Sequence, residues 1–147
     1  MGSENHTNIH GCAIVLDRCG LLICGPSGSG KSTLCQRLID TWQSIGKFAA
    51  WIGDDRIYIE TLHCTHIAHT TPQIAGLAEQ RFLGIVEVDH QSSCVLDLEI
   101  CLIPHANLER LPDGQTSQQH ENLTSINVPE RNTELAVQLV IEHMKQI

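Results

Sequence analysis

Apolar runs early in the chain alternate with short polar or Gly-rich segments. Residues 11–16 and 20–24 are apolar and flank a short segment at 17–19, a pattern that predicts two paired strands. After a Gly- and Ser-rich segment, apolar residues recur at the spacing of a helix, and Gly46 then predicts the end of that helix. The recurring residues are Leu34, Leu38, Ile39, Trp42 and Ile45.

The rest of the chain predicts mainly strands and one terminal helix. Residues 61–72 fit no pattern clearly, and the polar residues 107–120, with a Pro-Asp-Gly turn, predict a loop. From Asn132 onward the periodicity predicts a helix capped by Asn132 or Thr133. Strand-like patterns cover residues 47–52, 56–60, 84–88, 94–103 and 123–128. Many strands around one early helix indicate an α/β fold with a mixed sheet rather than a regular βαβ winding.

Length and charge narrow the class of protein. A chain of 147 residues is expected to form one domain, at residues 9–147, after a polar N-terminal arm at residues 1–8. The net charge of −8 argues against nucleic acid as a partner. No apolar stretch reaches the length of a membrane span, and no secretory signal is visible, so we expect a cytoplasmic protein. The seven cysteines form no CxxC pair, which predicts reduced thiols buried as small apolar residues.

Residues 25–32 read Gly-Pro-Ser-Gly-Ser-Gly-Lys-Ser and match the phosphate-binding loop G-x-x-x-x-G-K-[ST] between a predicted strand and helix. Glycines let consecutive N–H groups turn toward phosphate oxygens, and the helix N-terminus adds positive potential. Lys31 would contact the β- and γ-phosphates, and the Ser32 hydroxyl would bind Mg²⁺. The chain is therefore expected to bind ATP or a related polyphosphate. The candidate nucleotide-binding residues are Gly25, Pro26, Ser27, Gly28, Ser29, Gly30, Lys31, Ser32 and Thr33.

Asp54 is the candidate general base. It follows the strand predicted at 47–52, and if that strand lies next to the phosphate-loop strand, its carboxyl end brings Asp54 beside the γ-phosphate. A carboxylate there can accept the proton of an attacking hydroxyl. The alternative reading is that Asp54 and Asp55 only form a turn. Asp97 and Glu99 alternate with Leu, which fits a strand with one wet face better than the metal-binding acid of an energy-coupling NTPase.

These residues together resemble the catalytic domain of HPr kinase/phosphorylase, a bacterial serine kinase whose fold is similar to the P-loop core of phosphoenolpyruvate carboxykinase. The resemblance rests on Ile-His-Gly at 9–11, the phosphate loop, Asp-Asp-Arg at 54–56 and, most specifically, Glu-Gln-Arg-Phe-Leu-Gly-Ile-Val at 79–86. Two weaker matches are Glu-Arg-Leu at 109–111 and Val-Pro-Glu-Arg-Asn at 128–132. The resemblance runs in order through nearly the whole chain. Its extent fits a short form without the separate N-terminal domain of the longer family members.

The resemblance implies a role for each matching residue. Asp54 would be the general base in phosphorylation and the general acid in the reverse phosphorolysis. Lys31 would bind the phosphates, and Ser32 and Glu79 would bind Mg²⁺. His10 and Arg110 would be further catalytic residues, Arg110 stabilising charge on the transferred group. The implied substrate is a seryl residue of HPr, a small phosphocarrier of the phosphotransferase system, and the family forms hexamers. The residues implied on the substrate side and in the phosphorolysis loop are Asp55, Arg81, Pro129 and Arg131.

The chain departs from the family pattern at two glycines, which are Phe82 and Glu130 here. These departures support one alternative, a nucleotide-binding sensor without catalysis. The other alternative is a small-metabolite kinase, which would need a lid with clustered arginines over the phosphates. Only the isolated Arg81, Arg110 and Arg131 are available for one.

A histidine-rich segment offers a further candidate site. His63, Cys64, His66 and His69 are residue types that bind Zn²⁺. On a strand, however, residues 63 and 66 face opposite sides, and no second ligand pair follows. We therefore expect a strand-and-loop segment near the substrate face rather than a metal centre.

Overall fold

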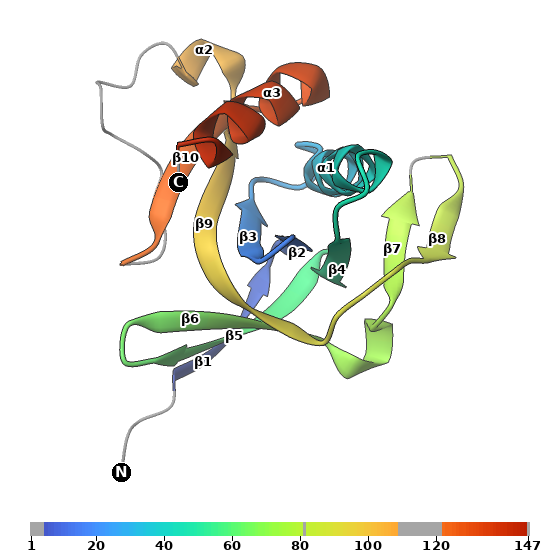
Figure 1. Cartoon of the computed structure of the whole chain (residues 1–147), viewed down its shortest axis with the longest axis vertical. Helices are drawn as coiled ribbons and strands as arrows, with labels where there is room; N and C mark the ends of the chain where they lie inside the picture. The colour runs from blue at the N-terminus through green and yellow to red at the C-terminus, as the bar shows by residue number, and fades with distance from the viewer. Residues whose placement is uncertain (1–4, 81, 109–121, 147) are drawn as a thin grey trace.

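Strands β2 and β3 form the centre of the fold, and they pair antiparallel as the two apolar runs predicted. The computed structural model describes residues 5–80, 82–108 and 122–146 (Figure 1). The strands are β1 (Asn5–His10), β2 (Cys12–Leu16), β3 (Cys19–Cys24), β4 (Ala49–Gly53), β5 (Arg56–Leu62), β6 (Thr65–Thr70), β7 (Leu77–Gln80), β8 (Gly84–Glu87), β9 (Ser93–Ile103) and β10 (Thr124–Pro129). The helices are α1 (Lys31–Ser44), α2 (His105–Leu108), α3 (Thr133–Met144) and a 3-10 turn at Pro72–Ile74.

Strand β9 joins two parts of one large sheet. Its first residues pair antiparallel with β6, and the rest of the strand lies parallel to β3 and β10. The strand order is β1-β5-β6-β9-β3-β2-β4, with β10 also paired to β9. Figure 1 shows β9 curving from the β1-β5-β6 part toward the helices. The mixed α/β architecture predicted from the sequence is thereby confirmed.

The central strands are buried on both faces of the sheet, because one apolar core covers one face and a second core covers the other. Cys12, Ile14 and Leu16 of β2 face α1 and α3, whose Leu38 and Val140 pack in the same core. The alternate residues of β2, Ala13 and Val15, face a second core that includes residues of β5 and β6. This arrangement explains why β2 reads as a continuous apolar run rather than an alternating one.

The elements around this centre differ from the prediction in several places. Strand β4 is not next to the phosphate-loop strand β3, because β2 lies between them. Strands β3 and β4 are both antiparallel to β2, so their carboxyl ends still share one edge of the sheet. Strands β1 and β7 were not predicted, because their residues are polar or too few to show a periodicity, and β6 lies in the segment for which only strand and loop were expected. None of the described helices has both the length and the apolar composition needed to cross a bilayer.

The two acidic residues of β9, Asp97 and Glu99, do not lie on one solvent-exposed face. Asp97 is exposed and accepts a hydrogen bond from the Gly20 amide at 2.9 Å, whereas Glu99 is fully buried. The expectation of a solvent-exposed face was wrong at Glu99, because a register shift in the β3–β9 ladder pairs Glu99 with Leu22, a residue of the second core. The Cys101 thiol donates a hydrogen bond to the Glu99 carboxylate at 3.3 Å.

No disulfide joins the cysteines, all of which are among the described residues. Four of them are buried as predicted, namely Cys12, Cys24, Cys35 and Cys101, whereas Cys19 and Cys94 are partly buried and Cys64 is exposed in the turn between β5 and β6. Burial, helped by the nearby Glu99 carboxylate, raises the pKa of the Cys24 thiol to about 12. Burial, helped by Asp97, raises the pKa of Cys94 to about 12 and that of Cys19 to about 11. These thiols therefore stay protonated and apolar well above neutral pH.

The raised thiol pKa values predict a loss of stability at alkaline pH. Thiols in the unfolded chain ionise near their ordinary value of 9.0, whereas Cys24 and Cys94 in the folded chain keep their protons to about 12. The free energy of unfolding should therefore be unaffected below pH 9. Above that it should fall by about 1.4 kcal/mol per pH unit for each thiol ionised only in the unfolded chain. Urea denaturation between pH 8 and 10.5 measures this slope.

The variant Cys24→Val should show a shallower slope, and Cys64→Ser, which changes an exposed thiol, should keep the slope of the parent chain. A stability that does not change over this pH range would contradict the role of the buried thiols.

Candidate functional site

The phosphate loop connects β3 to α1 and leaves an open cradle. Gly28 and Gly30 have φ values of 79° and 98°, in the left-handed region that favours glycine, and a Cβ added at Gly28 would meet no atom within 4 Å. Helix α1 has no side-chain cap and no acidic residue in its first turn, so its first N–H groups face this space. A pocket of about 480 Å³ lies here, lined by Gly28, Gly30, Ser32, Thr33, Glu79, Arg131 and Thr133. Its shape and donors fit a phosphate chain.

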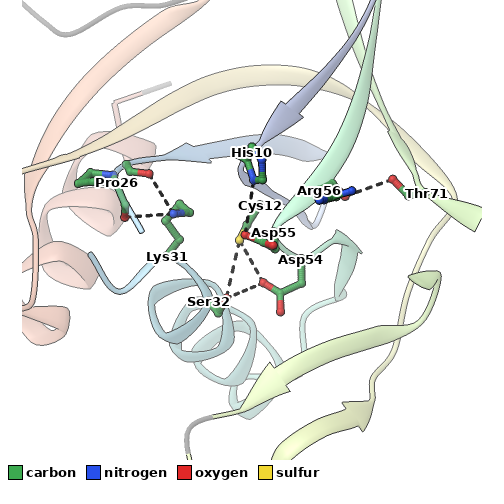
Figure 2. Close-up of polar contacts among 10 residues, drawn as sticks. His10, Cys12, Pro26, Lys31, Ser32, Asp54, Asp55, Arg56 and Thr71 are labelled. Atoms are coloured by element: carbon green, nitrogen blue, oxygen red, sulfur yellow. Dashed lines mark hydrogen bonds and ion pairs between the residues drawn. The ribbon is translucent and has the colours of Figure 1, made fainter. Parts of the chain in front are cut away.

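Lys31 folds back over the loop. Its Nζ donates to the carbonyl oxygens of Gly25 at 2.9 Å and Pro26 at 3.2 Å (Figure 2). The buried Ser29 hydroxyl has no hydrogen-bond partner among the described residues. Lys31 therefore keeps bonding capacity for an anion, since an ammonium carries three donors.

The Asp54 carboxylate is the point where distant elements meet. Ser32 Oγ of α1 donates to Asp54 Oδ1 at 2.5 Å, and Cys12 Sγ of β2 donates to the same oxygen at 3.2 Å (Figure 2). The backbone N–H of Glu79 in β7 donates to Oδ2 at 2.7 Å. Asp54 is only 7% exposed, so these bonds fix its side chain beside the phosphate loop.

Asp55 and His10 lie beside the turn that connects β4 to β5. Asp55 adopts a left-handed φ of 69°, and its carboxylate is 4.0 Å from His10 Nδ1 (Figure 2). Both side chains are largely exposed. His10 lines a cavity of about 870 Å³ together with His6, Arg56, Tyr58 and His69. His10 thus lines this neighbouring cavity rather than the phosphate pocket.

The segment after β10 packs against the phosphate loop. The Arg131 amide donates to the Ser29 carbonyl at 3.1 Å, and Arg131 Nε donates to the Gly28 carbonyl at 3.4 Å. Pro129 is buried at the end of β10, and the Glu130 amide donates to the Ile103 carbonyl at 2.8 Å. This segment therefore brings a guanidinium to the phosphate pocket.

The two departures from the family glycines have different consequences for the backbone. Phe82 has a φ of 71° and is 94% exposed, so a bulky residue occupies a conformation that favours glycine. Glu130 is not among the described residues with a positive φ; the left-handed residue there is its neighbour Arg131, with a φ of 58°. A glycine is therefore not required at position 130.

Two of the arginines predicted as site residues lie outside the part of the chain that the structure describes. These are Arg81 and Arg110, so their predicted roles stay predictions. The structure does place Glu79 on the same pocket as Ser32. Carboxylate and hydroxyl oxygens are the ligands that Mg²⁺ prefers, usually together with phosphates and water, so this pair fits the ion.

The histidine-rich segment is spread over a hairpin. His63 and Cys64 form the turn between β5 and β6, both with left-handed φ values. His66 contacts Thr61 Oγ1 at 2.9 Å, and His69 contacts Glu60 Oε1 at 3.2 Å. In the part of the chain that the structure describes, no three His, Cys, Asp or Glu side chains form a group that could hold a metal ion.

Several contacts of the site were missed in the sequence. They are the Cys12 thiol and the Glu79 amide on Asp54, and the stacked rings of His6 and Tyr58, whose centroids are 4.9 Å apart. The apolar run at 12–16 placed Cys12 in a strand, but nothing in it indicated which carboxylate Cys12 would meet. The polar residues at 5–8 carried no signal for a strand.

Comparison with known proteins confirms the resemblance to HPr kinase/phosphorylase. The chain is 31% identical over 102 residues to the HPr kinase/phosphorylase of Clostridium beijerinckii and 26% identical over 138 residues to that of Clostridium acetobutylicum. These matches cover 67% and 89% of this chain but only 32% and 43% of the relatives, so the chain spans less than half of either relative. No family model matches the chain.

The fold has a counterpart among solved structures. The structure of the HPr(Ser) kinase/phosphatase from Coxiella burnetii superposes with a TM-score of 0.73 and covers 95% of this chain and 97% of that chain. The sequence identity is 22%, so this match establishes the fold alone.

The shared contacts at Asp54 predict a structural effect of removing its carboxylate. Asp54→Ala leaves the donors of Ser32, Cys12 and Glu79 without this acceptor, so the free energy of unfolding should fall by about 2 kcal/mol. Hydrogen exchange at the Glu79 amide should become faster. The control Asp55→Asn changes an exposed carboxylate and should shift stability by less than about 0.5 kcal/mol. An unchanged exchange rate at Glu79 in Asp54→Ala would show that the contact is not formed.

Proposed function

We propose that this chain is an ATP-dependent serine kinase that phosphorylates an HPr-type phosphocarrier. The observation that carries the proposal is the Asp54 carboxylate, bonded at 2.5 Å to Ser32 of the phosphate loop, in a chain similar to HPr kinase/phosphorylases. A carboxylate at that place is where a kinase needs its base.

The phosphate loop supplies the nucleotide site of this proposal. Backbone N–H groups of the loop and of the first turn of α1 bind the phosphates, and Lys31 exchanges its carbonyl partners for phosphate oxygens. Arg131 reaches the same pocket from β10. Ser32 and Glu79 would hold Mg²⁺, which supplies neutralisation of the phosphate charge when bound.

Asp54 has room for one more donor. An ionised carboxylate offers about four acceptor positions, and Ser32, Cys12 and Glu79 occupy three of them. The seryl hydroxyl of the acceptor donates to the remaining position. Its proton passes to Asp54 as the seryl oxygen bonds to the γ-phosphorus, and the bond from that phosphorus to the bridging oxygen breaks to release ADP.

The acceptor protein enters from the side of Asp55. The cavity of about 870 Å³ lined by His10, Arg56 and Tyr58 opens next to the Asp54–Asp55 turn. It is large enough for several side chains of a protein segment, whereas a small-metabolite kinase would need a closing lid over a small substrate.

The finer parts of the proposal follow the resemblance. They comprise reverse phosphorolysis through Asp54 and the Pro129–Arg131 segment, catalytic roles for His10, Arg110 and Arg81, and a core like that of phosphoenolpyruvate carboxykinase. They also comprise a cytoplasmic hexamer that regulates a sugar or nitrogen phosphotransferase system.

A phosphotransfer assay tests the proposal directly. Incubation with Mg²⁺, ATP and HPr should give HPr phosphorylated on serine, identified by mass spectrometry, and added inorganic phosphate should reverse the reaction if phosphorolysis operates. Nucleotide binding by a folded chain without transfer to any HPr would contradict the kinase and favour the sensor.

The role of Asp54 predicts a separation of binding from transfer. Asp54→Asn keeps an oxygen near Ser32 but no longer accepts a proton, so the transfer rate should fall by at least about 100-fold. Nucleotide affinity, measured by calorimetry, should change by less than about threefold. The control Asp40→Asn alters an exposed carboxylate on α1 that contacts Gln36 and should leave both quantities unchanged. Transfer at the parent rate in Asp54→Asn would exclude Asp54 as the base.

A further inference from the structure

We propose that Cys12 is a positioning residue that holds the Asp54 carboxylate for phosphoryl transfer, an inference that rests on the proposed kinase function. Cys12 is the first residue of β2, and Asp54 follows the last residue of β4. Cys12 Sγ donates to Asp54 Oδ1 at 3.2 Å inside the protein, where Cys12 is 0% and Asp54 7% exposed.

The thiol is suited to this task because its own position is fixed. Cys12 pairs with Ile23 in the β2–β3 ladder, and its side chain packs in the core against α1. Cys35 of α1 packs in the same core, and Cys12 Sγ also lies 3.9 Å from Ser32 Oγ at the start of that helix. A donor held by a strand on one side and a helix on the other has little freedom to turn away from Asp54.

Cys12 also differs from the other donors on Asp54. Ser32 faces the phosphate pocket as well as Asp54, so its hydroxyl serves two groups. The Glu79 amide bonds to the other carboxylate oxygen, Oδ2. Cys12 is therefore the donor on Oδ1 that has no place in the phosphate pocket, and it keeps the carboxylate plane in place when Ser32 is engaged there.

The consequence is specific to the transfer step. Without the thiol, Oδ1 is held by Ser32 alone and the carboxylate can rotate away from the acceptor hydroxyl. Nucleotide binding depends on the phosphate loop, which Cys12 does not line. Loss of the thiol should therefore lower kcat and leave the KM for ATP almost unchanged.

Three single variants separate this role from simple core packing. Cys12→Ala removes the donor, and its kcat should fall by about 10- to 100-fold, the effect of one hydrogen bond to a charged group. Cys12→Ser keeps a donor of similar size and should retain kcat within about threefold. Cys94→Ala removes a thiol from β9, away from Asp54, and should leave kcat within about twofold of the parent chain.

Two kinetic outcomes would overturn the proposal. One is a Cys12→Ala variant with the parent kcat. The other is a Cys12→Ser variant as slow as Cys12→Ala, because that result would mean that the volume of the side chain matters and its donor does not.

Infrared spectroscopy gives a readout that needs no phosphoryl acceptor. The difference spectrum between the parent chain and Cys12→Ala isolates the S–H stretching band of Cys12. In Asp54→Asn the acceptor loses its charge, so this band should move to higher frequency as the hydrogen bond weakens. A band at the same frequency in both chains would overturn the proposal. If the parent chain transfers nothing to HPr, the proposed function fails, and this spectral comparison still decides whether Cys12 holds Asp54.

Discussion

The Asp54 carboxylate accepts hydrogen bonds from the start of α1, the start of β2 and the backbone of β7. These elements are far apart in the sequence and are brought together only where the sheet edge meets the phosphate loop. A buried carboxylate without such donors would be costly, so the fold has to satisfy it. The same requirement places a hydroxyl, a thiol and a candidate base within one small space. Stability and the proposed chemistry therefore depend on the same set of bonds.

In the function proposed for this chain, phosphate recognition is local. With a net charge of −8, the protein as a whole repels anions, so capture depends on groups at short range. The open glycine cradle, the uncapped start of α1 and the side chains of Lys31 and Arg131 provide those groups. Arg131 reaches the pocket because the backbone after β10 bonds to the phosphate loop itself. The parallel pairing of β10 with β9, which in turn pairs with β3, thus contributes to the site as well as to the sheet.

The two positions where the chain departs from the family glycines show why a motif has to be read with its backbone. Phe82 is held in a left-handed conformation at the tip of the β7–β8 hairpin, where a β-carbon is unfavourable and the ring is exposed. Glu130 replaces a glycine at no such cost, because the left-handed residue of that turn is Arg131. The departure at 130 therefore carries little weight against catalysis. The departure at 82 lies at the strained tip of a hairpin whose first strand, β7, contains Glu79, the residue whose amide bonds to Asp54.

The sequence by itself determined the features that depend on neighbouring residues. The paired strands β2 and β3, the phosphate loop and helix α1 were predicted because strand alternation, helical spacing and glycine conformation are local properties. The cap of α3 was predicted for the same reason, and the Asn132 side chain does accept from the Leu135 amide. Only the tertiary structure decided that β2 separates β3 from β4, that β9 joins two parts of the sheet, and that the polar strand β1 pairs with β5. It also decided that Cys12 and Glu79 meet Asp54, since the energy of a contact between residues 25 or more positions apart depends on packing and backbone pairing, which leave no local periodicity.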